Sequence, residues 1–182
     1  MVRLPAQPNL ILIGFMGAGK SSVGKVLAVT LGREYLDTDE MVEAMAGTSI
    51  GEIFRREGEE EFRRREGAAI DEAVGSPNRV VSVGGGAVLS FENRTVLKQA
   101  GFLVYLRANP ETLANRLAHV TDRPLLNVAD RAGRIRDLMV ARGPVYETAG
   151  DVTVDTDDRT PQQAADEILA WYQRRMGEVA GR

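Results

Sequence analysis

Cysteine is absent from this sequence of 182 residues, and histidine and tryptophan each occur only once. Without cysteine there is no disulfide framework and no thiolate metal site, which fits a reducing, cytoplasmic location. Apolar runs are also short. None approaches the roughly 18 residues that a membrane-spanning helix needs, so we expect no membrane partner. Residues 1–8 lack the apolar core of a signal peptide and are expected to be a ragged leader.

Neither sign of charge is in large excess, because 23 basic residues face 26 acidic ones and the formal net charge is −3. Arginine clusters occur, but each lies among acidic residues, so we expect no nucleic-acid partner. The length predicts a single domain over residues 1–182, with its core in residues 10–60, 75–115 and 129–176.

The most informative segment is Gly14–Ser21, which reads Gly-Phe-Met-Gly-Ala-Gly-Lys-Ser. It fits the phosphate-binding loop Gly-x-x-x-x-Gly-Lys-[Ser/Thr]. An apolar run at residues 9–13 precedes it and is typical of a buried parallel strand. Val23, Val26 and Leu27 follow it with helical spacing. The loop therefore joins a strand to a helix, as the motif requires.

This context explains the residue types of the loop. Backbone N–H groups from Gly17 to Ser21, with the positive end of the following helix, would surround phosphate oxygens. Lys20 would reach the β- and γ-phosphates, and the Ser21 hydroxyl would be a ligand of Mg²⁺. We therefore predict that the protein binds a nucleoside triphosphate, and the acceptor of its γ-phosphoryl group has to be read from other residues.

A pair of acidic residues ends the next predicted strand, at residues 34–39. Asp37 and Asp39 alternate along an extended segment, so both side chains would point to the same side, beside the phosphate loop. One could serve the metal ion and the other a substrate hydroxyl. The alternative is structural, because Asp37, Thr38 or Asp39 could simply cap a helix over residues 40–46.

One arginine and three glycines are candidates for the acceptor site. Residues 54–66 carry many charges of both signs, and most of them fit a solvated helical face with i, i+4 pairs. Arg63 is the exception, because the apolar Phe62 beside it turns this part of the helix toward the interior. Gly84–Gly86 follow a buried strand at residues 79–83 and would leave room for a ligand against bare backbone.

The remaining pattern predicts the fold class. Strands alternate with helices, which indicates an α/β fold with a five-stranded parallel sheet flanked by helices; the strands are expected at residues 9–13, 34–39, 79–83, 102–106 and 151–155. Gly58 is expected to mark a bend or a joint between two helices. A helix over residues 130–146 is expected to be interrupted or ended at Arg142-Gly143-Pro144. Residues 119–128 are predicted to be a mobile lid, whose Arg123 could stabilise the charge of the transferred phosphoryl group.

Six motifs in order make the sequence similar to the shikimate kinases, small relatives of the nucleoside monophosphate kinases, from about Leu10 to Trp171. They are Gly-Phe-Met-Gly-Ala-Gly-Lys-Ser at 14–21, Asp-Thr-Asp at 37–39, Phe-Arg at 62–63, Gly-Gly-Gly at 84–86, Arg-Pro-Leu-Leu at 123–126, and Arg142 before Pro-Val-Tyr at 144–146. The resemblance implies a phosphate-binding-loop kinase fold and a monomer that uses ATP and one Mg²⁺ ion per subunit. It also implies phosphorylation of the 3-hydroxyl of shikimate, a step of chorismate and aromatic amino acid biosynthesis.

The resemblance further implies a role for each matching residue. ATP would be bound by Gly17, Ala18, Gly19, Lys20, Ser21 and Ser22, by Arg123 of the lid, and by Arg116 and Arg159 on the adenine side. Mg²⁺ would bind Ser21 directly and Asp37 through water. Shikimate would bind in a region that includes about residues 38–65, with its hydroxyls on Asp39, its carboxylate on Arg63 and Arg142, and its ring beside Gly84, Gly85 and Gly86. Lys20, Asp39 and Arg123 would be the catalytic residues. One departure from the family pattern is Ser22, where threonine is common.

Three other functions remain open at this point. A gluconate kinase shares the architecture, but Phe15-Met16 and the two arginines Arg63 and Arg142 disfavour it. A nucleoside monophosphate kinase would need a base-binding pocket where these arginines and Gly84–Gly86 stand. A nucleotide-dependent switch with no acceptor would leave Asp39 and the two arginines without a joint purpose.

Overall fold

The computed structural model of the protein describes residues 7–120, 124–126 and 128–180. Within these residues the chain forms one sheet of five parallel strands, β1 (Asn9–Ile13), β2 (Glu34–Asp37), β3 (Arg79–Ser82), β4 (Gly101–Arg107) and β5 (Val152–Asp155). Their order across the sheet is β2-β3-β1-β4-β5. The predicted fold class, a parallel sheet flanked by helices, is confirmed.

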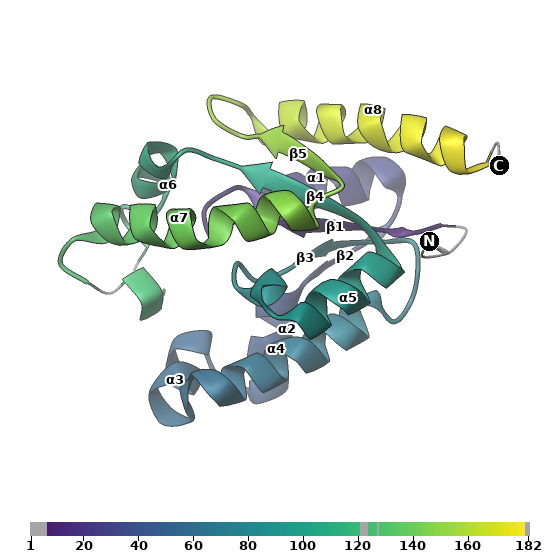
Figure 1. Ribbon diagram of the computed structural model, residues 1–182. Coiled ribbons are helices and arrows are strands. Elements are labelled where there is room, and N and C mark those ends of the chain that lie inside the picture. Colours follow the sequence, from purple (N-terminus) through teal and green to yellow (C-terminus); the bar gives the residue numbers. More distant parts are fainter. Residues whose placement is uncertain (1–6, 121–123, 127, 181–182) are drawn as a thin grey trace.

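Helices join the strands and cover both faces of the sheet (Figure 1). They are α1 (Lys20–Leu31), α2 (Thr38–Ala46), α3 (Ile50–Arg56), α4 (Gly58–Val74), α5 (Phe91–Ala100), α6 (Pro110–Arg116), α7 (Arg131–Ala149) and α8 (Pro161–Ala180). Two short 3-10 helices, η1 (Ala87–Leu89) and η2 (Pro124–Leu126), lie in the connections. Helices α1 and α8 pack against each other on one face, whereas α4, α5 and α7 cover the other.

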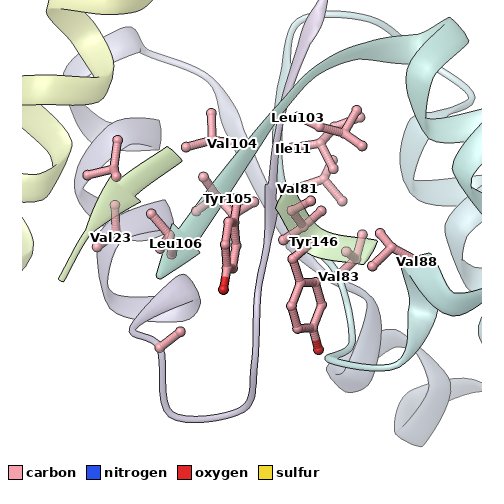
Figure 2. Packing of buried hydrophobic residues seen from close by; sticks show 14 of the residues in the cluster. Ile11, Val23, Val81, Val83, Val88, Leu103, Val104, Tyr105, Leu106 and Tyr146 are labelled. Carbon is pink, nitrogen blue, oxygen red and sulfur yellow. The ribbon is translucent and has the colours of Figure 1, made fainter. Parts of the chain in front are cut away.

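The central strand β1 carries the core of the sheet. Its four apolar residues from Leu10 to Ile13 are fully buried, as expected for a parallel strand that is covered on both faces. Ile11 lies between Val81 of β3 and Leu103 of β4 in the strand register, and Figure 2 shows these side chains in the apolar cluster. Each such buried side chain contributes about 1.5–3 kcal/mol relative to an exposed one.

The strand order also places the functional segments. From β1 the chain crosses past β3 to β2 at one edge of the sheet, whereas from β3 it crosses past β1 to β4. The chain therefore leaves β1 and β3 in opposite directions at their carboxyl ends. Open α/β sheets bind ligands in the crevice at such a point. The phosphate loop after β1 and the glycines after β3 both start there.

A second, smaller apolar cluster joins the helices beside this edge. It consists of Val42, Ile50, Ile53, Phe62 and Ala69, from α2, α3 and α4. The rings of Phe54 and Phe62 add to it with their centroids 4.7 Å apart. Helix α3 ends and α4 begins around Gly58, whose φ is 87°, so the predicted joint between two helices is confirmed.

Two predicted boundaries are wrong, and both have a local cause. Strand β2 ends at Asp37, because the Asp37 carboxylate accepts the backbone N–H of Asp39 at 3.0 Å and starts α2 at Thr38. Helix α7 does not end near Pro144 but continues to Ala149. The proline removes one helical hydrogen bond, yet the turn after it is held by the buried side chains of Tyr146 and Ala149.

Part of the predicted lid lies outside the described residues, Arg123 included; residues 124–126 form η2. In the described part of the chain, no helix combines the length and the apolar character needed to cross a membrane.

Candidate active site

A cavity of about 600 Å³ lies at the carboxyl edge of the sheet. The phosphate loop, the start of α2, the helices α3 and α4, the glycines after β3, η2, α7 and the start of α8 all contribute to its wall. Figure 1 shows η2 and α3 at the same end of the molecule. Every predicted site residue that the structure describes lines this cavity except Gly84, which lies next to Asp39 and Glu66 of the wall.

The phosphate loop presents the open end of a helix to this cavity. Gly19 precedes α1 with a φ of 95°, a left-handed conformation that glycine adopts without strain. No side chain caps the helix, so its first N–H groups are available to an anion. The Lys20 ammonium donates to the carbonyl oxygens of Gly14 at 3.0 Å and Phe15 at 3.1 Å, which holds the lysine against its own loop.

Asp37 is held from three sides. Its Oδ2 atom accepts hydrogen bonds from the Ser21 hydroxyl at 2.9 Å and from the Tyr35 hydroxyl at 3.0 Å, while Oδ1 accepts the N–H of Asp39. Burial, reinforced by the Asp37 charge, raises the pKa of Tyr35, so this phenol keeps its proton as a donor. The structural alternative is thus confirmed for Asp37, which caps α2. The same carboxylate also touches the serine of the phosphate loop, and its role toward a metal ion stays a prediction.

This pair of oxygen groups fits Mg²⁺. Magnesium is usually bound by one or two carboxylates together with substrate phosphates and waters, not by a cage of protein ligands. Among the residues that the structure describes there is no group of three or more His, Cys, Asp or Glu side chains able to hold a metal. A serine hydroxyl hydrogen-bonded to one carboxylate, at the mouth of a phosphate loop, is the arrangement expected for a metal that arrives with a nucleotide.

Asp39 reaches the cavity from the first turn of α2, not from an extended strand. The expected reason for its position, alternation along a strand, was therefore wrong, although it lines the cavity together with Asp37. A Cβ atom on Gly84 would lie 2.7 Å from Oδ1 of Asp39 and 2.7 Å from Oε1 of Glu66. Glycine at this position is what lets the two carboxylates approach the loop.

Arg63 projects from α4 over the ring of Phe62, 5.1 Å from its centroid. Its guanidinium forms ion pairs with Glu66 at 2.7 Å and with Glu59 at 3.0 Å. A Cβ on Gly86 would collide with it at 2.5 Å, so the guanidinium lies directly against the glycine loop. The prediction that this arginine turns inward is consistent with its place in the cavity wall.

Helix α7 contributes a second arginine to the cavity wall. Arg142 is only 7% exposed, and its guanidinium lies 6.0 Å from the centroid of the Phe15 ring in the phosphate loop. One turn later, the Tyr146 hydroxyl donates a hydrogen bond to the Gly85 carbonyl. The cavity wall thus has two guanidinium groups from α4 and α7, one of them buried, and each lies near a carboxylate or an aromatic ring.

The other side of the cavity has two further arginines. Arg116 donates to the carbonyl of Gly17 at 3.2 Å and to the carbonyl of Thr156 at 2.6 Å, so it ties the phosphate loop to the connection after β5. Arg159 forms an ion pair with Glu167 of α8. Both line the cavity, and their contact with the adenine stays a prediction.

Comparison with known proteins identifies the family to which this arrangement belongs. The sequence model of the shikimate kinases matches residues 16–173 of the chain. The chain belongs to the shikimate kinase family. The shikimate kinase of Symbiobacterium thermophilum is 46% identical over 169 residues, which is 92% of this chain and 97% of that protein.

Solved structures agree with this family. A structure of the shikimate kinase from Acinetobacter baumannii, in complex with shikimate, superposes with a TM-score of 0.90 at 38% identity, and covers 94% of this chain and 98% of that one. A gluconokinase from Sinorhizobium meliloti shares only the fold, with 18% identity and a TM-score of 0.58 over 96% of each chain. The resemblance to the shikimate kinase family seen in the sequence is confirmed, and the gluconate kinase alternative is not favoured.

Sequence reasoning missed three residues at the cavity: Glu66, which lines it, and Tyr35 and Tyr146, which bond to Asp37 and to Gly85 in its wall. Glu66 was assigned with its neighbours to a solvated face, but it is 1% exposed. Burial raises its pKa, which the Arg63 charge opposes and the Asp39 charge reinforces. Its spacing from Phe62, Ala69 and Ile70 places it on the apolar side of α4, which was the available signal. Tyr146 stands in the last of the six motifs but was given no role, and Tyr35 carried no such signal.

Proposed function

We propose that this chain transfers the γ-phosphoryl group of ATP to the 3-hydroxyl of shikimate, giving ADP and shikimate 3-phosphate, in the synthesis of chorismate and the aromatic amino acids. The observation that carries the proposal is that one cavity holds the phosphate-loop lysine, Lys20, together with the Asp39 carboxylate and the two arginines Arg63 and Arg142. Shikimate is a carboxylate that bears hydroxyl groups, and this set of side chains complements both features.

The nucleotide would occupy the phosphate-loop side. The backbone N–H groups from Gly17 to Ser22 would bind the phosphates at the open end of α1, and Arg116 and Arg159 would flank the adenine. Arg123 would be the lid arginine over the phosphoryl group. Ser21, and Asp37 through a water molecule, would hold one Mg²⁺ ion per subunit. A bound Mg²⁺ supplies neutralisation of charge on the phosphate oxygens.

The acceptor would occupy the other side. Arg63 and Arg142 would bind the shikimate carboxylate, since planar guanidinium groups match a carboxylate in geometry and charge. The shikimate ring would then lie against the loop Gly84–Gly86. Asp39 would accept a hydrogen bond from the 3-hydroxyl and orient its oxygen toward the γ-phosphorus.

The reaction itself needs little covalent help from the protein. The 3-oxygen of shikimate forms a bond to the γ-phosphorus, the bond from that phosphorus to the β–γ bridging oxygen breaks, and the hydroxyl proton passes to the Asp39 carboxylate. Lys20 and Arg123 would stabilise the negative charge on the transferred group. In-line placement of the two substrates supplies most of the remaining rate enhancement.

We further propose that the enzyme works as a monomer in the cytoplasm. The proposed binding residues all come from one chain, so a second copy is not needed to complete the cavity.

The test is release of ADP from Mg-ATP in parallel reactions with shikimate, gluconate, AMP or no acceptor. We expect ADP only with shikimate. Turnover with gluconate or AMP would keep the nucleotide side and overturn the acceptor side. Nucleotide binding without turnover on any of the three acceptors would support the switch alternative instead.

A further inference from the structure

The loop Gly84–Gly86 contains three successive glycines, so no side chain restricts the orientation of its peptide groups. The structure nevertheless holds all three carbonyl groups. The Gly84 carbonyl accepts the N–H of Ala87 at 3.0 Å, and the Gly86 carbonyl accepts the N–H of Leu89 at 3.0 Å. The middle carbonyl, of Gly85, is held by the Tyr146 hydroxyl, which is the one side chain among these three donors.

The N–H groups of the same loop are used unequally. The Gly84 N–H donates to the Thr38 hydroxyl at 3.0 Å. Over the part of the chain that the structure describes, the N–H groups of Gly85 and Gly86 donate to no other protein group. Both glycines line the cavity. A loop with bonded carbonyls and available N–H groups is suited to bind an oxygen of a ligand.

Peptide geometry relates the Tyr146 contact to one of these donors. The peptide between Gly85 and Gly86 is planar and trans, so its C=O and N–H groups point in opposite directions. Because the Gly85 carbonyl is directed at Tyr146, the N–H of Gly86 is directed away from Tyr146. The Arg63 guanidinium lies next to Gly86 on the cavity side. A flip of this peptide would turn the carbonyl oxygen to the cavity and remove the donor.

Tyr146 is itself held firmly. Its side chain is fully buried, and its ring stacks on that of Tyr105 with centroids 5.3 Å apart and an interplanar angle of 23°. Figure 2 shows both rings in the apolar cluster, with their hydroxyl groups directed toward the same end of the sheet. Burial, opposed by the Arg142 charge, raises the pKa of Tyr146 to about 12, so the hydroxyl keeps its proton at any physiological pH.

We propose that Tyr146 is a positioning residue for the acceptor: its hydroxyl selects the orientation of the Gly85–Gly86 peptide in which the Gly86 N–H donates to an oxygen of shikimate. This inference rests on the proposed function. Tyr146 is not among the residues that line the cavity. It would act through the glycine loop, and it lies on the same helix, α7, as Arg142.

The test compares the full-length enzyme with Tyr146→Phe and with the matched control Tyr105→Phe, which removes a hydroxyl from the other ring of the stacked pair. Both substitutions keep the ring. We measure KM for shikimate and for ATP, and the Kd of shikimate by calorimetry without nucleotide. For Tyr146→Phe we expect the KM and Kd of shikimate to rise about tenfold, the effect of one hydrogen bond at the upper end of its usual strength, with KM for ATP within twofold. The control should stay within twofold for both substrates.

Equal KM values for shikimate in the two variants would overturn the inference, as would an equal rise of both KM values in Tyr146→Phe. A second measurement does not depend on any variant. In ¹⁵N-labelled wild type, shikimate should shift the Gly86 amide resonance strongly, and an unmoved resonance would refute the inference. Failure of the wild type to turn over shikimate is a separate result, because it rejects the proposed function before Tyr146 is examined.

Discussion

The Glu66 carboxylate accepts a hydrogen bond from the Arg63 guanidinium, with 2.7 Å between Oε2 and Nη1, at a position where the Glu66 side chain is almost fully buried. The arginine proposed to bind the substrate carboxylate is thus anchored by a carboxylate of the protein itself. Since the partner Glu59 is exposed, Glu66 is the anchor that solvent does not screen.

Replacing Glu66 by glutamine should therefore weaken shikimate binding. Glutamine keeps the shape and one acceptor oxygen but loses the charge, and a hydrogen bond to a charged group contributes about 1.5–3 kcal/mol. We expect KM for shikimate to rise about tenfold and KM for ATP to stay within twofold, measured by steady-state kinetics. The control is Glu61→Gln, which removes a carboxylate paired with Arg64 and Arg65 outside the cavity. A matching rise in the control would contradict the assignment.

The same variant gives a prediction for stability against pH. Burial raises the pKa of Glu66 above its ordinary value of 4.5, so the native state binds this proton more tightly than the unfolded state does. Glu66 is therefore favourable at low pH, and its contribution is lost as the pH rises from about 4.5 through the raised native pKa. In denaturation at a series of pH values, the free energy of unfolding of the wild type should fall relative to Glu66→Gln over that range. A relative rise would show that Arg63 outweighs burial.

Arg63→Ala should separate the two substrates. Loss of a hydrogen-bonded charge pair with the shikimate carboxylate costs about 2–5 kcal/mol, so we expect KM for shikimate to rise about 30-fold or more with ATP binding close to normal. Arg64→Ala is the control, because Arg64 is 69% exposed and pairs with Glu61 on the outer face. Calorimetry with each substrate alone is the measurement. Equal loss of shikimate and ATP binding would refute the placement of Arg63.

Tyr35→Phe should raise the Mg²⁺ concentration that the enzyme requires. The Tyr35 hydroxyl donates to the same oxygen of Asp37 as Ser21 does, and partners that orient a metal ligand usually change metal affinity about 10-fold or more when they are removed. The readout is ADP binding by calorimetry over a Mg²⁺ titration, with EDTA as the metal-free reference. The half-saturating Mg²⁺ concentration should rise, whereas ADP affinity in EDTA should not change. Loss of ADP affinity in EDTA would show damage to the phosphate loop instead.

Gly84→Ala should be far more harmful than an alanine at a glycine with open space around it. The added Cβ would lie 2.7 Å from oxygens of both Asp39 and Glu66, so one carboxylate has to move, and we expect kcat/KM for shikimate to fall at least about tenfold, which a shift of 1.4 kcal/mol would produce. Gly177→Ala is the control, because it lies in helix α8 with no atom within 4 Å of the added Cβ. Kinetic constants near those of the wild type for Gly84→Ala would contradict this prediction, because they would show that the two carboxylates can move aside without loss of activity.

The sequence was sufficient for the fold and for most of the cavity wall, because both depend on strong local patterns. Glycines and a lysine at fixed spacing between a strand and a helix leave few alternatives to a phosphate-binding loop. The buried strands can be recognised from continuous apolar runs such as Leu10–Ile13. The prediction placed Asp39 correctly beside the phosphate loop, but the reason given for that position was wrong. The Asp37 cap, a hydrogen bond over two residues, overrode the alternation expected of a strand.

The parts that could not be predicted depend on packing between distant segments. Pro144 should end a helix because proline lacks a backbone N–H and its ring clashes with the preceding turn. The burial of Tyr146 beyond it nevertheless keeps α7 continuous. In the sequence, Glu66 is one of many charged residues of α4. Only the packing of α2 and the glycine loop against α4 buries it. The contact between Tyr146 and Gly85 spans 61 residues, and no local pattern encodes it.

The strand order β2-β3-β1-β4-β5 places two continuous parts of the sequence on the two sides of β1. In the proposed function, residues from β2 to the glycine loop would build most of the acceptor side, and residues from β4 to the start of α8 would build the nucleotide side, with β1 and its loop between them. Exchange of one continuous stretch, residues 38–86, would therefore transplant most contacts to the acceptor and leave the nucleotide contacts in place. Helix α7 is the exception, because Arg142 and Tyr146 reach back across the boundary, and an acceptor module grafted without them would lack one wall.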